Sequence, residues 1–290
     1  MKVKHIRLLA GALAVLTTLT LGGCGMNVQQ DLSATPKETP KETPIEQPSA
    51  SPAESPAAPD AGSAVETITF EAADGLTVTA DLYRCGVPDA PFILLFHQAG
   101  YSKGEYLEIA PQLNAMGYDC LAIDQRSGGT CNGVANETHK AAAAKKLPCG
   151  YTDAYADLKG ALNYAVEQYA PKKLIAWGSS YSASLTLILA AEYPEEVQAA
   201  LAFSPGEYFH LQDRTVAEYA ADITQPVFIT SAKSEENAWR KIADAIPSKG
   251  CEFFVPQGNG LHGSSALFES TPNHAEYWDA VKSFLSSLNQ

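Results

Sequence analysis

The stretch that decides the fold is KLIAWGSSYSASL, residues 173–185. Its first half is a short apolar run typical of a buried strand, and small residues then lead into a segment with helical spacing. A serine on such a sharp strand-to-helix turn points its hydroxyl out of the fold. Gly178 and Ser182, two residues on either side of Ser180, are small, so neighbouring backbone can pass close to both. The pattern indicates that Ser180 is a nucleophile, unless Gly-Ser-Ser forms only a polar turn.

Strands and helices alternate through the rest of residues 64–290. Two half-exposed strands of a hairpin are predicted at 65–70 and 76–83 from their alternating pattern. Apolar runs typical of strands buried on both faces lie at 91–96, 119–123, 174–177, 199–203, 226–231 and 251–255. Helices are predicted at 103–116, 152–169, 182–192, 215–221, 236–245 and 274–288. This order predicts an α/β fold with a mostly parallel eight-stranded sheet and helices on both faces, whose functional residues collect at the carboxyl ends of the strands.

A serine nucleophile needs a base, and three histidines follow it in the chain: His210, His262 and His274. His262 lies in a glycine-rich loop, residues 257–263, just after a buried strand, so it can fold back over the same edge of the sheet. His274 falls at the start of the last helix and His210 in a loop, where surface or capping roles are expected. The sequence therefore predicts His262 as the base.

The base in turn needs an acid that fixes its tautomer. Glu235 and Glu236 come just past the strand at 226–231. We take Glu235 as the acid and Glu236 as the reserve, because an acidic residue in the first turn of a helix is also favoured by the helix dipole. The chain order is then Ser180, Glu235, His262.

This order, together with the motifs FHQAG at 96–100 and DQRSG at 124–128, resembles the α/β-hydrolases, in particular their dienelactone-hydrolase-like and esterase branches. The resemblance implies the α/β-hydrolase fold for residues 64–290. Two positions differ from the family pattern: Ser182 stands where glycine is usual, and Glu235 where aspartate is more frequent. His97 and Asp124, at the two motifs, are interpreted as structural.

The resemblance also implies an oxyanion hole, formed by the backbone N–H of Tyr181 with that of Gln98 or Ala99. The expected activity is hydrolysis of a carboxylic ester or similar acyl bond in a small molecule, through an acyl-enzyme on Ser180 and without a metal ion or other cofactor. An amide-cleaving peptidase with the same triad is one alternative. A lipid-anchored binding protein that has lost turnover is the other. The sequence does not predict an oligomeric state.

The amino end reads as an export signal. Three cations precede a short apolar run that closes on Leu21-Gly22-Gly23-Cys24, which is too short for a membrane span. This ending resembles the lipobox of bacterial lipoproteins, which implies cleavage after residue 23 and lipid on Cys24. The protein is then expected at the cell membrane, lipid-anchored on the extracytoplasmic face.

Residues 24–63 are rich in Pro, Ser, Thr and Glu and have few residues to bury, so a disordered tether is predicted. The formal charge of the chain is −13, and removal of three cations with the leader makes it −16. An acidic surface argues against nucleic-acid binding and against polybasic docking to lipid. Membrane contact is therefore expected through the anchor only.

Residues 127–150 are too polar for core and too long for a plain connection, which indicates a lid or a pocket wall. Cys131 and Cys149 bracket much of this segment, and a disulfide between them is predicted for an exported protein. No cysteine has the spacing of a structural zinc site.

Overall fold

The computed structural model describes residues 65–247 and 250–289. The leader, Cys24 and the tether lie outside the described residues, so their assignment stays a prediction. Within the described residues, no helix is both long and apolar enough to span a bilayer.

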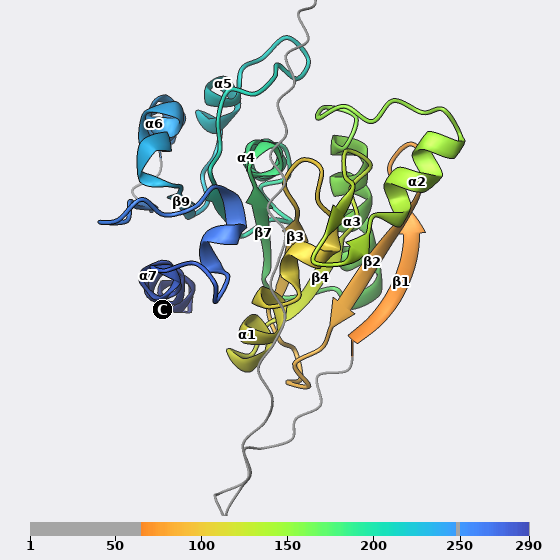
Figure 1. Cartoon of the computed structure of the whole chain (residues 1–290), viewed down its shortest axis with the longest axis horizontal. Coiled ribbons are helices and arrows are strands. Elements are labelled where there is room, and N and C mark those ends of the chain that lie inside the picture. Colours follow the sequence, from red (N-terminus) through yellow and green to blue (C-terminus); the bar gives the residue numbers. More distant parts are fainter. Residues whose placement is uncertain (1–64, 248–249, 290) are drawn as a thin grey trace, which may run out of the picture. The chain divides into compact units, whose positions relative to one another are not determined.

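An eight-stranded sheet forms the centre of the domain (Figure 1), with the strand order β1-β2-β4-β3-β7-β8-β9-β10. Its strands are β1 (Val65–Glu71), β2 (Thr77–Tyr83), β3 (Phe92–Phe96), β4 (Asp119–Ile123), β7 (Leu174–Ser179), β8 (Ala199–Phe203), β9 (Val227–Thr230) and β10 (Cys251–Phe254). β1 and β2 are antiparallel to their neighbours, and all other pairs are parallel. The predicted eight-stranded, mostly parallel sheet is confirmed.

Helices cover both faces of this sheet. The α-helices are α1 (Ile109–Ala115), α2 (Glu137–Ala144), α3 (Tyr155–Tyr169), α4 (Tyr181–Glu192), α5 (Val216–Ala220), α6 (Glu236–Ala245) and α7 (His274–Ser287). Three short 3₁₀ helices are η1 (Lys103–Tyr106), η2 (Lys233–Glu235) and η3 (Gly263–Leu267). One core packs α3 to α6 on one face, and a second core packs α1 and α7 on the other. β3 shows the division, since Phe92 and Leu94 join the first core while Ile93 and Leu95 join the second.

The helix predicted at 103–116 is split into η1 and α1. Pro111 lies in the first turn of α1, where its missing N–H costs nothing. In one continuous helix its ring would clash with the carbonyl of Leu107. The chain therefore closes one short helix at Tyr106 and starts another.

The predicted disulfide between Cys131 and Cys149 is wrong, because all five cysteines of the described residues are free thiols. Cys131 lies in β5 (Thr130–Cys131), which pairs with β6 (Val134–Ala135) in a hairpin that packs on η1. Cys149 instead follows α2, which packs on β2. Most of residues 127–150 is thus packed against the domain, and a lid role stays a prediction.

A buried ion pair holds the loop after β4 to α3. Asp157 is fully buried and accepts hydrogen bonds from the Nε and the backbone N–H of Arg126, at 3.1 and 2.8 Å. The guanidinium also binds Asp74 in the β1–β2 turn. Three segments are therefore joined around one buried cation.

We expect Asp157→Ala to lower the free energy of unfolding by about 3–5 kcal/mol, because it leaves the Arg126 charge buried with half of its partners removed. Asp222→Ala, which breaks the exposed pair of Arg214 and Asp222, should cost less than about 1 kcal/mol. Urea unfolding followed by circular dichroism measures both. Equal costs would contradict a structural role for the buried pair.

Candidate active site

Ser180 lies between β7 and α4 in a conformation that non-glycine residues rarely adopt, with φ 60° and ψ −124°. Its backbone N–H donates to the carbonyl of Phe203 at the end of β8, at 2.7 Å. This bond holds the strained turn against the neighbouring strand. Such strain is kept where the surrounding structure over-determines it, as at reactive sites.

Gly178 and Ser182, the two small residues of the turn, have different structural roles. A Cβ on Gly178 would lie 2.4 Å from the carbonyl oxygen of Ser182 and 2.6 Å from the Cα of Ala183. Ser182 is buried, and its hydroxyl accepts from the N–H of Ser179 at 2.9 Å and donates to the carbonyl of Phe96 at 2.8 Å. Serine in place of the usual glycine therefore ties the turn to β3 and does not distort it.

His262 bridges the other two residues of the predicted triad. Its Nε2 lies 2.7 Å from the Oγ of Ser180, and its Nδ1 lies 2.6 Å from the Oε1 of Glu235. An ionised carboxylate can only accept, so the proton is on Nδ1 and Nε2 is free to take the proton of the serine hydroxyl. The three residues predicted from the sequence are brought together.

Glu235 is held by more than the histidine. Its Oε2 accepts from the hydroxyl of Ser204 at 2.7 Å and from the N–H of Ala232. Burial raises the pKa of Glu235, but the hydrogen bonds from His262 and Ser204 outweigh this, so its pKa lies below the usual value. The carboxyl group of Glu235 is therefore ionised at neutral pH.

Ser204 is a site residue that the sequence analysis missed. It follows β8 with a left-handed φ of 56°, and its Oγ accepts from the N–H of Gly263 at 2.9 Å while donating to Glu235. One hydroxyl thus joins the acid to the loop that carries His262. The one sequence signal for Ser204 is its position directly after the buried strand β8.

The alternatives from the sequence lie elsewhere. Glu236 begins α6 and pairs with Arg240 one turn on, so it does not reach His262 in this structure. His274 hydrogen bonds through Nδ1 to the carbonyl of Thr271.

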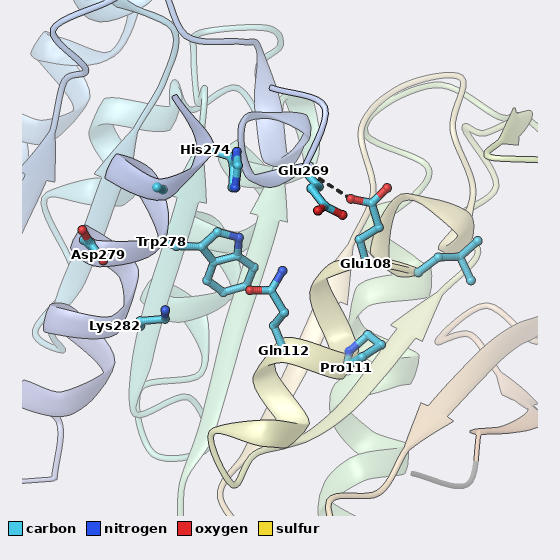
Figure 2. Close-up of a pocket in the computed structure, with 10 residues that line it drawn as sticks. Glu108, Pro111, Gln112, Glu269, His274, Trp278, Asp279 and Lys282 are labelled. Atoms are coloured by element: carbon cyan, nitrogen blue, oxygen red, sulfur yellow. Dashed lines mark hydrogen bonds between the residues drawn. The ribbon is translucent and has the colours of Figure 1, made fainter. Parts of the chain in front are cut away.

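A surface cavity of about 520 Å³ is lined by residues of α1 and α7. Figure 2 shows His274, Trp278 and Glu108 in its lining. No member of the triad lines this cavity. It is therefore separate from the candidate active site.

The oxyanion donors are corrected in one place. The N–H of Gln98 already donates to Oε2 of Glu105 at 2.8 Å, so it is not available to a substrate. The Gln98 carbonyl accepts from Nδ1 of His97 and from the N–H of Tyr101. Because N–H and C=O point in opposite directions in a trans peptide, the N–H of Ala99 points away from those two donors. Ala99 and Tyr181, which lies in the first turn of α4, therefore remain the candidate oxyanion donors.

His97 and Asp124 are structural, as predicted. His97 is fully buried, and its Nε2 accepts from the N–H of Gln125 at 2.9 Å while its Nδ1 donates to the Gln98 carbonyl. Burial lowers the pKa of His97 to about 4, so the ring is neutral. Asp124 accepts from the N–H groups of Lys103 and Glu137.

Two tyrosines beside the nucleophile were also missed. Tyr151 stacks on Tyr181 with ring centroids 4.6 Å apart and is 41% exposed. Tyr208 donates to the carbonyl of Ser204 at 2.8 Å and is likewise 41% exposed. The accessible rim of the site is therefore partly aromatic.

The fold and this site define a class of protein. A mostly parallel sheet with a serine on a strained strand-to-helix turn, followed in the chain by an acid and a histidine, is the arrangement of an α/β-hydrolase. The sequence matches the serine aminopeptidase, S33, family over residues 88–252, more than half of the chain, and the protein belongs to that family. No curated protein sequence matches the chain significantly.

Solved structures with the same fold include several hydrolases. An esterase from Pyrococcus furiosus has a TM-score of 0.61 and 15% identity, covering 79% of this chain and 94% of that one. A dienelactone hydrolase from Anabaena variabilis has a TM-score of 0.60 and 14% identity, covering 77% and 98%. The protein Est1E from Butyrivibrio proteoclasticus, with ferulic acid bound, has a TM-score of 0.59 and 14% identity, covering 76% and 98%. At these identities the likeness shows the fold alone.

We expect Gly178→Ala to lower the free energy of unfolding by about 1–3 kcal/mol, because the new methyl group overlaps the backbone of α4. The matched control is Gly258→Ala, at an exposed loop glycine whose nearest atom to an added Cβ is 4.0 Å away. That change should stay within about 0.5 kcal/mol. Similar losses of stability in urea would mean that the turn is not close-packed.

Proposed function

We propose that this protein is a serine hydrolase that cleaves carboxylic esters or related acyl bonds of small molecules through an acyl-enzyme on Ser180. The observation that carries the proposal is the bridge made by His262, which contacts Ser180 through one ring nitrogen and Glu235 through the other. This is the geometry that a hydroxyl nucleophile needs for activation.

In the first half of the reaction, the Oγ of Ser180 attacks the acyl carbonyl carbon while its proton moves to Nε2 of His262. The negative charge on the carbonyl oxygen is stabilised by the N–H groups of Tyr181 and Ala99. Loss of one such donor typically costs on the order of 3 kcal/mol of barrier. The tetrahedral intermediate collapses as His262 gives the proton to the departing alcohol, and the acyl group stays on Ser180.

In the second half, His262 takes a proton from water, whose oxygen attacks the acyl carbon. Collapse returns the proton to the Oγ of Ser180 and releases the carboxylic acid. Glu235 stays ionised throughout and stabilises the imidazolium in each half. No step needs an electron acceptor or a group beyond water and the substrate.

Amide substrates are the second candidate, because the family that the chain matches is described as serine aminopeptidase. The same triad serves both reactions, and the amine leaving group differs in needing its proton before it departs. Parallel assays with p-nitrophenyl esters and with amino-acid p-nitroanilides separate them. Turnover of anilides only would reject the esterase proposal.

We expect a fluorophosphonate probe to label the wild-type protein and to leave Ser180→Ala unlabelled. His262→Ala should lower p-nitrophenyl ester turnover by at least about 10³-fold, because the nucleophile loses its base. His274→Ala, at a histidine that lines the separate surface cavity, is the matched control and should keep normal turnover. An unlabelled wild type would instead support a binding protein that has lost catalysis.

The acid is tested by two neighbouring substitutions. We expect Glu235→Gln to lower kcat by about 10²- to 10⁴-fold, because the amide no longer stabilises the imidazolium. Glu236→Gln removes only the pair with Arg240 and should change kcat less than about threefold. Steady-state kinetics on one ester measures both, and a large loss at Glu236 would reverse the assignment.

A further inference from the structure

A second carboxylate, that of Glu105, lies buried beneath the candidate active site. Glu105 is in η1 and is fully buried. Its Oε2 accepts from the N–H of Gln98 and its Oε1 from the hydroxyl of Ser179, both at 2.8 Å. Ser179 directly precedes the nucleophile. One carboxylate therefore joins the loop after β3 to the end of β7.

The loop that carries His262 is hydrogen bonded to the same two residues, Ser179 and Gln98. The hydroxyl of Ser179 accepts from the N–H of Ser264 at 2.8 Å, and the side-chain amide of Gln98 donates to the hydroxyl of Ser265 at 3.2 Å. A Cβ on Gly263 would lie only 2.4 Å from the Ser179 hydroxyl oxygen. We call Glu105, Gln98, Ser179, Ser264 and Ser265 the carboxylate junction. It connects the three chain segments that supply the nucleophile, an oxyanion donor and the base.

The junction fixes the direction of the oxyanion donor. Glu105 holds the N–H of Gln98, while the carbonyl of Gln98 is held by His97 and Tyr101. Both sides of that residue's backbone are thereby fixed. The next N–H, that of Ala99, has its direction set by the planar trans peptide. Donors fixed before the reaction need no reorganisation when the oxyanion forms.

The charge of Glu105 also acts on the base. Among the described residues Glu105 forms no salt bridge, and its hydrogen-bond partners are neutral. The titratable groups that face it are His262, Tyr106, Tyr181 and Cys131. Tyr106, Tyr181 and Cys131 stay neutral, because burial raises the pKa of each side chain. His262 is therefore the one group among these four that can become a cation beside Glu105. An ionised Glu105 therefore favours the imidazolium that forms in each half of the reaction.

We propose that Glu105 is a positioning residue of this hydrolase, whose ionised carboxylate fixes the Ala99 donor and stabilises the protonated His262 from behind the nucleophile. The proposal rests on the proposed function, because it concerns the same acyl transfer. Since a buried carboxylate without a cation is costly for folding, its presence here fits a role in catalysis better than a role in stability.

Burial raises the pKa of Glu105 to about 7, against the lowering by its hydrogen bonds to Gln98 and Ser179. The junction is therefore fully charged only above neutral pH. As the pH falls through 7, a protonated Glu105 accepts more weakly and no longer stabilises the imidazolium. The part of the activity that depends on the charge of Glu105 should then be lost as the pH falls.

The test is Glu105→Gln, which keeps the size of the side chain and removes its charge. We expect kcat for a p-nitrophenyl ester to fall about 10- to 100-fold, the loss typical of a charge-assisted hydrogen bond, while KM changes less than about threefold. The acid limb of log(kcat/KM) against pH should be steeper in the wild type than in Glu105→Gln, because the variant lacks the ionisation at position 105.

The matched control is Glu108→Gln. Glu108 is the next acidic residue in the chain, and it likewise accepts from a backbone N–H, that of Glu269, but it lines the separate surface cavity shown in Figure 2. It should change neither kcat nor the slope of the acid limb.

Three outcomes decide the matter. A wild type with no ester turnover would reject the proposed function itself. An active wild type with unchanged kcat and acid limb in Glu105→Gln would reject the role of Glu105 alone. A variant that loses activity only in parallel with its urea midpoint would show that Glu105 supports the fold and does not act on the site.

Discussion

The structure depends on the left-handed backbone of Ser180. A β-strand and an α-helix can meet at so sharp an angle only if one residue adopts this conformation, and a side chain there is pushed out of the sheet. The strain is met by bonds from three strands: Ser180 donates to Phe203, and Ser182 joins Ser179 to Phe96. The packing around Gly178 follows from the same constraint. The reactive hydroxyl is thus a product of the fold.

Parallel pairing explains why the triad could be predicted from the sequence. Ser179 pairs with Phe203, and Phe203 with Thr230, so the residues after β7, β8 and β9 emerge at one edge of the sheet. Apolar runs mark these strand ends in the sequence, and Ser180 and Glu235 come after two of them. The glycine-rich loop after β10 folds back over this edge, which brings His262 to Ser180 and Glu235. The periodicity of the strands, together with the small-residue turn and the glycine-rich loop, thus predicted that residues far apart in the chain meet at one edge.

The remaining site residues depend on contacts between loops, which leave no periodic signal. Ser204 and Tyr208 look like ordinary loop residues, and Glu105 looks like one polar position in a helix. Gln98 was one of two donors predicted from the motif, with Ala99 as the other, but the N–H of Gln98 already donates to Glu105. The disulfide prediction failed for a related reason: Cys131 and Cys149 bracket a segment whose parts pack on different elements, β5 on η1 and α2 on β2.

The buried part of the site is built from hydroxyl groups, and their chemistry explains why. A serine hydroxyl can donate and accept at once, so a single atom can join two segments. Ser179 accepts from Ser264 and donates to Glu105, while Ser204 accepts from Gly263 and donates to Glu235. Each of these chains of bonds ends on a carboxylate, one below the nucleophile and one beside the base. Above neutral pH, two anions therefore face one imidazole, and both favour its protonated form. This arrangement stabilises the state in which the Ser180 proton has moved to His262. An acyl-transfer catalyst must stabilise that state more strongly than the ground state.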